Sequence, residues 1–328
     1  MAWAIPTPSG FLNVYASGYG VGPGTGLTRE DLSDLILNLD PWDNLVYASA
    51  PKTQAFSTTH EWAYDTLPVA SRAGVPEGSD FSPNTLTTPV RTSNFTQIFR
   101  FDVGVTGTAT AMNLAGIGDV YNYHVLNGTH AISKAVEQRL FDQSTLADYP
   151  GAGTASSSGT QVRLMKEFAA MMDSTMIVDA GLNTLTADMV DQAMENAYGV
   201  GTRPEMLCVS HGVKADLSRN VASSVAVGGT REVAQADKRI VRSVDIYEGD
   251  FGALSIVPNR SIPQASGAQA WGWAWLIERS RIGIATLRPI KHVPLAKTGD
   301  NTKGMVVGEL TAELRHPKGI AAIKRLIT

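Results

Sequence analysis

Alternating hydrophobic and polar positions predict two strand-like runs in the first third of the chain, over residues 52–66 and 90–107. This period of two is typical of a half-buried strand. The runs are separated by more than twenty residues that carry four prolines and two glycines. A connection of that length is uncommon inside a compact domain, so it predicts a projecting or mobile loop. The alternating apolar side chains of the second run are Phe99, Phe101, Val103 and Val105.

Helical spacing follows over residues 119–142, with Asp119 as a candidate N-cap. Gly128 lies inside this pattern and weakens a helix by about 1 kcal/mol relative to Ala, so we expect a kink or a close contact there. Residues 150–160 are rich in Gly, Ser and Thr and predict a flexible segment. A second helix is predicted over residues 162–172.

From about residue 184 the pattern predicts a mixed unit of helices and strands. Val190, Ala193, Met194 and Ala197 form a helical stripe, and Met206–Val209 is a short apolar strand. A hairpin is predicted from Arg239–Tyr247 and Ala253–Val257, and a further strand follows it. That last strand carries three alternating tryptophans, which we expect in a core or subunit interface rather than in a sugar-binding platform: Trp271, Trp273 and Trp275.

The first fifty residues have no clear period and predict an arm that lies on another surface. A short amphipathic helix is predicted from Thr28, after a stretch in which glycine alternates from Gly18 to Gly26. Hydrophobic residues make up 43% of the chain and charged residues 18%, below the usual quarter. A low charge fraction indicates either a large core or a surface covered by other subunits.

Charge and targeting signals exclude several classes of protein. The net charge of −4 disfavours the basic face that a sequence-specific nucleic-acid-binding protein carries. The chain has no run of eighteen apolar residues, and its N-terminus lacks the basic and apolar regions of a signal peptide. Cys208 is the one cysteine, and its apolar neighbours predict a buried structural thiol. We therefore expect neither membrane insertion nor a disulfide framework.

Two motifs resemble catalytic signatures but are incomplete. The stretch from Gly18 to Gly26 fails the G-x-G-x-x-G pattern in every register. His60 and Glu61 begin an H-E-x-x-H pattern, but Tyr64 stands where the second histidine is required. The sequence thus predicts no catalytic, metal-binding or cofactor-binding residue, and we expect a structural protein rather than an enzyme.

The C-terminal sixty residues contain the most informative pattern. Residues 287–300 predict an extended segment that ends in a Lys-Thr-Gly-Asp turn, and a long strand from Lys303 is predicted to run to the C-terminus. Five short sequence motifs, here and earlier in the chain, are informative. They are Phe95-Thr-Gln-Ile-Phe99, Gly201-Thr-Arg-Pro-Glu205, Arg288-Pro289, Leu295-Ala-Lys-Thr-Gly-Asp300 and Gly304-Met-Val-Val-Gly-Glu309. Through these motifs and the order of its predicted elements, the sequence resembles major capsid proteins of tailed bacteriophages with the Hong Kong 97-like fold, in the branch of the enterobacteria phage SU-ten capsid protein.

The resemblance implies an α+β fold with five parts. They are an N-terminal arm (1–50), an extended loop hairpin (51–110), a long spine helix with the first part of the peripheral domain (111–183), an axial domain (184–280) and C-terminal strands that complete the peripheral domain (281–328). In some members of this fold a loop lysine bonds covalently to a neighbour's asparagine. Lys52 lies at the loop base, but no motif matches, so non-covalent interlocking is expected.

The resemblance also implies the partners. We expect hexamers and pentamers in an icosahedral shell around double-stranded DNA, a portal protein at one vertex, and a separate scaffolding or decoration protein as an open question. The expected location is the virion, with assembly in the host bacterial cytoplasm. The candidate interface residues are Trp62, Tyr64, Phe81, Arg91, Phe95, Arg279, Arg281, Arg288, Lys297, Asp300 and Lys303.

Two alternatives stay open. An encapsulin-like nanocompartment shares the fold but encloses enzyme cargo, and the C-terminal motifs argue against it. A metabolic α/β enzyme would need a convergent set of titratable residues, which the sequence does not show.

Overall fold

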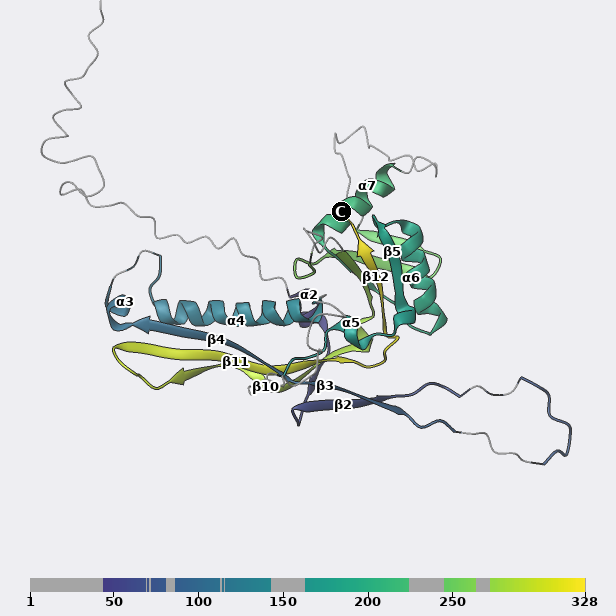
Figure 1. Ribbon diagram of the computed structural model, residues 1–328, viewed down its shortest axis with the longest axis horizontal. Coiled ribbons are helices and arrows are strands. Elements are labelled where there is room, and N and C mark those ends of the chain that lie inside the picture. Colours follow the sequence, from purple (N-terminus) through teal and green to yellow (C-terminus); the bar gives the residue numbers. More distant parts are fainter. Residues whose placement is uncertain are drawn as a thin grey trace, which may run out of the picture.

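The computed structural model describes residues 44–68, 70, 72–80, 86–112, 114, 116–142, 163–223, 245–263 and 272–327. Within them the chain forms a long four-stranded sheet with one long helix on it, a separate six-stranded unit, and a hairpin that projects away from both (Figure 1). This mixture of helix and strand agrees with the predicted α+β class.

The four-stranded sheet has the order β1-β10-β11-β4. Its strands are Lys52–Gln54 (β1), Ile282–Leu295 (β10), Asn301–Leu314 (β11) and Gln97–Thr106 (β4). β10 and β11 pair antiparallel from Ile282 opposite Leu314 to Leu295 opposite Lys303, and β1 pairs parallel with β10. The predicted extended segment, turn and strand are therefore confirmed.

The prediction that this strand continues to the C-terminus is wrong. β11 ends at Leu314, and a turn over residues 315–319 redirects the chain into β12 (Ile320–Leu326). Gly319 allows this turn because a side chain there would meet Arg281 and the carbonyl of His316 at 2.9 Å. β12 pairs with the six-stranded sheet, so residues 320–326 do not belong to the long sheet.

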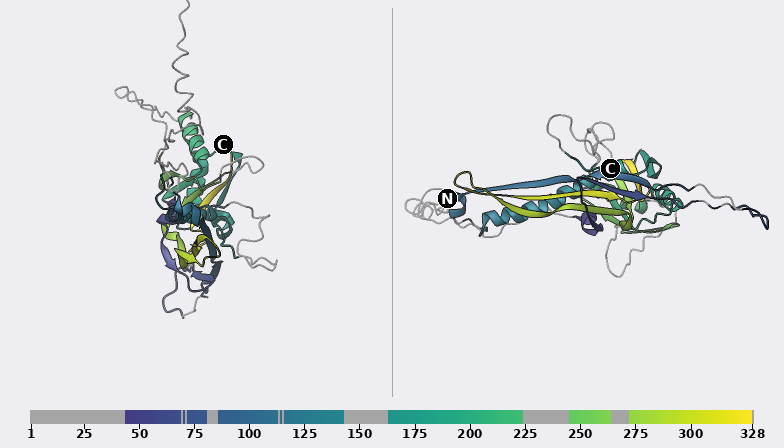
Figure 2. Two further views of the ribbon diagram at one scale, coloured as in Figure 1. Left: turned by 90° about the vertical axis from the view of Figure 1, so that its left-hand side faces the viewer. Right: turned by 90° about the horizontal axis from the view of Figure 1, so that it is seen from below.

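The predicted helix over residues 119–142 is confirmed as α4 (Val120–Leu140), and the Asp119 side chain caps it by accepting from the Asn122 amide at 3.1 Å. Both Figure 1 and the view from below in Figure 2 show α4 running alongside the long strands. Ile132, Val136 and Leu140 are buried on its inner side. Gly128 is a close contact, since a Cβ there would lie 2.5 Å from Cδ1 of Phe101 on β4.

The predicted pair of strand-like runs contains a hairpin and parts of the long sheet. β2 (Thr59–Tyr64) and β3 (Val90–Phe95) pair antiparallel, from Thr59 opposite Phe95 to Tyr64 opposite Val90. The hairpin and the β10–β11 turn point toward opposite ends of the molecule (Figure 1). The short helix α3 (Gly107–Ala111) lies at the same end as that turn.

The six-stranded sheet has the order β5-β12-β9-β6-β8-β7. Two helices belong to this unit, α6 (Ala187–Gly199) and α7 (His211–Ser223), and the predicted helical stripe is the buried face of α6. The predicted hairpin is confirmed for its described part as β7 and β8. The strands other than β12 are Ile177–Asn183 (β5), Gly272–Ile277 (β9), Met206–Val209 (β6), Gly252–Pro258 (β8) and Ile246–Gly249 (β7).

Aromatic packing joins the helix on the long sheet to the six-stranded unit. Trp275 on β9 is fully buried, and its ring lies 5.9 Å from Phe141, which follows α4, and 6.3 Å from Phe168. Trp273 stacks on Trp275 at 5.1 Å, which places both in the core as expected, and Cys208 is buried as well. Burying side chains of this size contributes about 2–3 kcal/mol each.

The helix predicted over residues 162–172 is wrong for most of its length. Residues 163–167 are not helical, and only Phe168–Met171 form a short helix, α5. The amides of Met165 and Lys166 donate instead to the side chains of Gln97 and Asn94, so they do not close helical turns. Two 3-10 turns, η1 (Ser174–Met176) and η2 (Arg279–Arg281), and the helix α2 (Leu45–Ser49) complete the described elements.

Several predicted features lie outside the described residues. They are the arm before residue 44 with its glycine stretch and the helix from Thr28, the flexible segment 150–160, the first half of the strand before β7, Phe81 and Trp271. In the part of the chain that the structure describes, no helix has the length and apolar character of a membrane span.

The contact between Gly128 and Phe101 yields a stability prediction. Gly128→Val introduces a branched side chain where the Phe101 ring already lies, so we expect about 1–3 kcal/mol of destabilisation from overpacking. Urea unfolding of the purified chain measures it. The penalty should shrink when Phe101→Ala is also present, because the two positions are in direct contact. An equal penalty in both backgrounds would contradict the close-contact interpretation.

Candidate assembly surfaces

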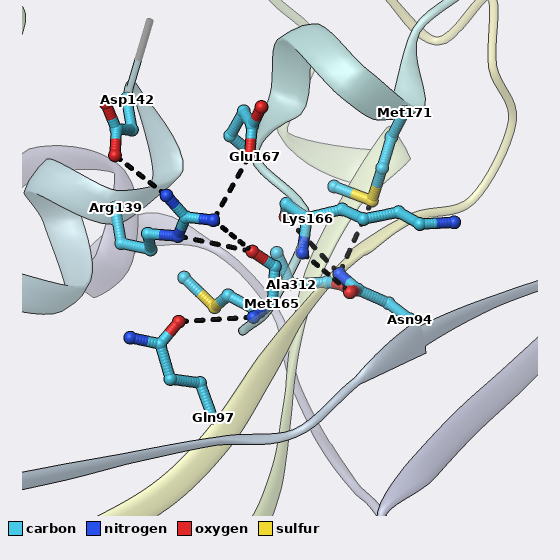
Figure 3. A network of polar contacts seen from close by, with 9 residues as sticks. All are labelled: Asn94, Gln97, Arg139, Asp142, Met165, Lys166, Glu167, Met171 and Ala312. Carbon is cyan, nitrogen blue, oxygen red and sulfur yellow. Dashed lines mark hydrogen bonds and ion pairs between the residues drawn. The ribbon is translucent and has the colours of Figure 1, made fainter. Parts of the chain in front are cut away.

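The base of the projecting hairpin is held by one buried amide, Asn94 on β3. Its Nδ2 donates to the Ala312 carbonyl on β11 at 2.8 Å, and its Oδ1 accepts from the Lys166 amide at 2.8 Å (Figure 3). A single side chain thus joins three separate segments. Because Asn94 is 1% exposed, its loss would leave buried polar groups without partners.

Arg139 at the end of α4 fixes the other side of the same network (Figure 3). Its guanidinium contacts Asp142 at 2.7 Å, the Met165 carbonyl at 2.9 Å and Glu167 at 3.4 Å. Burial raises the pKa of Glu167, and the charge of Arg139 opposes that shift. The segment after residue 163 is therefore positioned by side chains from α4 and from the hairpin base.

The hairpin strand β2 adds contacts to the end of β11. Trp62 Nε1 donates to the Leu314 carbonyl at 2.8 Å, and the Tyr64 ring meets His316 edge-on at 4.9 Å. His60 lies 3.6 Å from Glu313. Trp62 and Tyr64, both proposed interface residues, are half-buried against their own chain and position the start of the hairpin.

Glu137 on α4 forms a junction between three parts of the chain. Its two carboxylate oxygens accept from the amides of Val46 and Tyr47 on α2, at 3.0 and 2.6 Å, and from Asn259 Nδ2 at 2.7 Å. Burial raises the pKa of this carboxyl, and the three hydrogen bonds and Lys52 only partly oppose the shift. Burial also lowers the pKa of Lys52 to about 8. The Lys52 ammonium lies 3.7 Å from the Tyr47 ring centroid.

A second buried carboxylate, Glu309 on β11, gathers two arginines. Its Oε1 accepts from Arg163 at 2.6 Å and from the Thr96 hydroxyl at 2.8 Å, and its Oε2 accepts from Arg288 Nε at 2.9 Å. The Glu309 side chain is 5% exposed, whereas those of Arg163 and Arg288 are 31% and 50% exposed. The arginines thus satisfy a buried charge and still reach the surface.

The structure separates the predicted interface residues into four places. Trp62, Tyr64, Arg91 and Phe95 lie on the hairpin, where the exposed Arg91 pairs with Glu61 at 3.2 Å and Phe95 is half-buried. The other described positions divide between η2, the middle of β10 and the β10–β11 turn. In that order they are Arg279 and Arg281, then Arg288, then Lys297, Asp300 and Lys303.

Two of these places have internal contacts as well. At η2, Arg281 pairs with Glu278 at 3.3 Å, whereas Arg279 is exposed. At the β10–β11 turn, the Asp300 carbonyl accepts from the Gly107 amide at 3.1 Å, Lys303 contacts Thr298, and Lys297 is exposed. The predicted residues do not form one cluster; they are distributed along the length of the molecule.

Sequence reasoning missed the buried polar residues Asn94, Glu137, Arg139 and Glu309. A signal exists for two of them. Glu309 follows an apolar run, and Glu137 lies between Val136 and Leu140 on the inner stripe of a helix. Acidic residues at such positions are rarely buried without partners, so both predict a distant cation or donor. Among the described residues no group of His, Cys, Asp and Glu has the arrangement of a metal site.

An elongated sheet with a long helix on it, a projecting hairpin and a separate α/β unit define the class of shell-forming proteins with the Hong Kong 97-like fold. Solved structures with this architecture include the capsid of a native GTA particle (10% identity, TM-score 0.61, covering 92% of this chain and 96% of that one). A solved structure from Gordonia phage Cozz is similar at 13% identity, with a TM-score of 0.61 and 93% of each chain covered.

The holo-SrpI encapsulin complex from Synechococcus elongatus also shares the fold, at 9% identity and a TM-score of 0.57, with 92% of this chain and 93% of that chain covered. Comparison with curated proteins gives no match. The sequence model of the SU10 major capsid protein family matches residues 15–326. The chain therefore belongs to this family, and it is a major capsid protein that builds a virion shell from many copies.

The Asn94 network predicts how the hairpin is held. Asn94→Ala removes both hydrogen bonds from a buried position, so we expect about 1–3 kcal/mol of destabilisation. Amide hydrogen exchange should rise selectively in β2 and β3. The matched control is Arg91→Ala on the same strand, whose exposed ion pair contributes under about 1 kcal/mol. Equal effects of the two substitutions would contradict the anchoring role.

The raised pKa of Glu137 predicts a pH-dependent stability. Folding favours the protonated Glu137 carboxyl. The stabilisation that this group contributes is therefore fully present below its ordinary pKa of 4.5 and is lost as the pH rises through the raised pKa. The difference in unfolding free energy between wild type and Glu137→Gln should therefore decrease with rising pH. Urea unfolding at pH values from about 4.5 upward tests this. A difference that grows with pH would show that the hydrogen bonds outweigh burial.

Proposed function

We propose that this capsid protein assembles as hexamers and pentamers into an icosahedral shell that encloses double-stranded DNA. The observation that carries the proposal is the projecting hairpin. Its connecting segment exposes apolar side chains that a lone subunit would leave in water, since Leu67, Val75 and Leu86 are 94%, 75% and 80% exposed. A second subunit under the hairpin would cover them.

In this proposal each part of the chain has one assembly role. The hairpin lies across a neighbouring subunit, and the α/β unit around residues 184–280 packs near the centre of each hexamer or pentamer. The β10–β11 turn with Lys297, Asp300 and Lys303 meets neighbours at the far end of the long sheet. Several modest contacts per subunit allow errors to be corrected, while their sum makes the closed shell stable.

The remaining partners follow from the same class of assembly. We infer a portal protein at one vertex, assembly in the cytoplasm of the host bacterium, and no catalytic step by this chain. A separate scaffolding or decoration protein is compatible with the proposal. The net charge of −4 suits a container that encloses DNA without gripping it by sequence.

An encapsulin-like compartment is the second candidate, because the holo-SrpI encapsulin complex has the same fold. The family match over residues 15–326 favours the phage capsid. The two candidates differ in content, since one shell encloses DNA and the other encloses protein cargo.

The experiment is negative-stain electron microscopy of the purified chain, combined with size-exclusion chromatography. We expect closed shells, or free hexamers and pentamers. A monomer or dimer under all conditions, including co-expression with a scaffolding protein, would overturn the proposal.

A hairpin variant tests the mechanism. Residues 66–88 are replaced by a short glycine-containing turn that preserves the β2–β3 pairs. We expect a subunit with unchanged thermal unfolding that forms no closed shells, because the segment that covers a neighbour is missing. Shells with wild-type yield and size would contradict a role of the hairpin in interlocking.

A further inference from the structure

The face of the long sheet opposite α4 carries an unusual combination of side chains. Gly304 lies against Tyr121 of α4, so the alternate residues of β11, Lys303, Met305, Val307 and Glu309, point to the other side. Residues paired with them on β4 and β10 share that side. They are Ile98, Arg100 and Asp102 on β4, and Arg288, Lys291, Val293 and Leu295 on β10. We call these residues the open face.

The open face is both apolar and basic. Ile98 and Leu295 are 47% and 43% exposed, so it presents hydrophobic surface to water. Arg100 is paired with Asp102 at 3.1 Å, and Glu309 is the one carboxylate that Arg163 and Arg288 share. Lys291 and Lys303 add two further cations. With Arg163 the cations number five and the carboxylates two, so the face has an excess of positive charge.

Arg163 and Arg288 are oriented for a further anion. Arg288 uses Nε for Glu309, and Arg163 uses Nη2, so each guanidinium retains other N–H donors. The buried Glu309 holds the two side chains in place before any partner arrives, which reduces the entropy lost on binding. A planar, pre-oriented guanidinium pair matches the geometry of a carboxylate.

We propose that Arg163 and Arg288 bind a carboxylate from the β2–β3 hairpin of a neighbouring copy, while Ile98 and Leu295 contact its apolar side chains. This inference rests on the proposed function. The described part of the hairpin segment carries the exposed acids Asp65, Glu77 and Asp80 beside its exposed apolar residues. Both halves of the contact are therefore complementary in charge and in apolar character.

The contact forms between copies and not within one chain. The hairpin leaves its own sheet and points away from it (Figure 1). Twenty-five residues separate Tyr64 from Val90, so the segment extends by up to roughly 40 Å from the end of β2. Acidic side chains on it lie over another subunit when the shell assembles.

The mixed character of the open face favours a protein partner over the DNA backbone. A surface that binds phosphates without sequence preference is dominated by Lys and Arg, whereas here exposed Ile98 and Leu295 lie among the cations. DNA binding is the competing outcome of the experiment.

The test is a charge exchange measured in nuclease-treated samples, so that DNA cannot contribute. Arg288→Glu is expected to raise the critical subunit concentration for shell formation by about tenfold or more. Combining it with Asp65→Arg, Glu77→Arg or Asp80→Arg should restore assembly to within about threefold of wild type for one of the three acids. Light scattering and electron microscopy give the critical concentration and the shell yield.

Two further variants separate assembly from folding. Arg288→Gln leaves Glu309 paired with Arg163 and Thr96, so the subunit should retain its thermal unfolding and still assemble less well. Arg203→Glu is the matched control, because Arg203 is an exposed arginine outside the open face. Adding Asp65→Arg, Glu77→Arg or Asp80→Arg to this control should not improve its assembly.

Each outcome decides the inference. Wild-type assembly by Arg288→Glu, or failure of all three charge exchanges to rescue it, would overturn the hairpin contact. Normal assembly of Arg288→Glu, combined with weaker DNA binding by its shells in a parallel sample to which DNA is added without nuclease, would assign the arginines to phosphate instead. If the wild-type chain itself stays a monomer or dimer under all conditions, including co-expression with a scaffolding protein, the proposed function fails, which is a result distinct from these.

Discussion

The antiparallel pairing of β10 and β11 is the constraint on which the other parts depend. Each strand has fourteen residues, and the pair extends along the length of the four-stranded sheet. β4 and β1 add to its two edges, and α4 packs on one side. The chain on either side of this pair leads into the six-stranded sheet, through β9 before it and β12 after it. The hairpin base, the α/β unit and α4 are thus all placed relative to one ladder.

Buried carboxylates and one amide connect the parts that the ladder alone does not fix. Glu137 joins α4 to α2 and to the loop after β8, Glu309 joins β11 to Arg163 and Thr96, and Asn94 joins β3 to β11. Such groups are costly to bury, and breaking them leaves unpaired charge or donors in the interior. They specify one arrangement of the segments, whereas apolar packing alone would permit the segments to shift.

Regular elements with a strong period were predictable from the sequence, and the distant contacts were not. The period of two in β4, the helical spacing of α4 with its Asp119 cap, and the turn after β10 follow from local rules. The helix expected over residues 162–172 fails because Asn94 and Gln97, about seventy residues away, take its amides. β12 pairs with two strands that are distant in the sequence, β5 and β9, which no local period encodes. Among the candidate residues, Trp62 and Tyr64 were expected to face a neighbour, and their contacts within the chain depend on the same long-range pairing.

The position of β12 has a consequence for how the protein is made. β12 lies between β5 and β9, in the interior of the six-stranded sheet, although it follows all the other strands in the sequence. A nascent polypeptide therefore holds an incomplete sheet, with β5 and β9 unpaired along the edges that β12 later joins, until residues 320–326 have left the ribosome. A product of premature termination lacks the strand that closes this unit. A chain that stops before residue 320 thus cannot complete the six-stranded sheet, and it would be a defective copy among its neighbours.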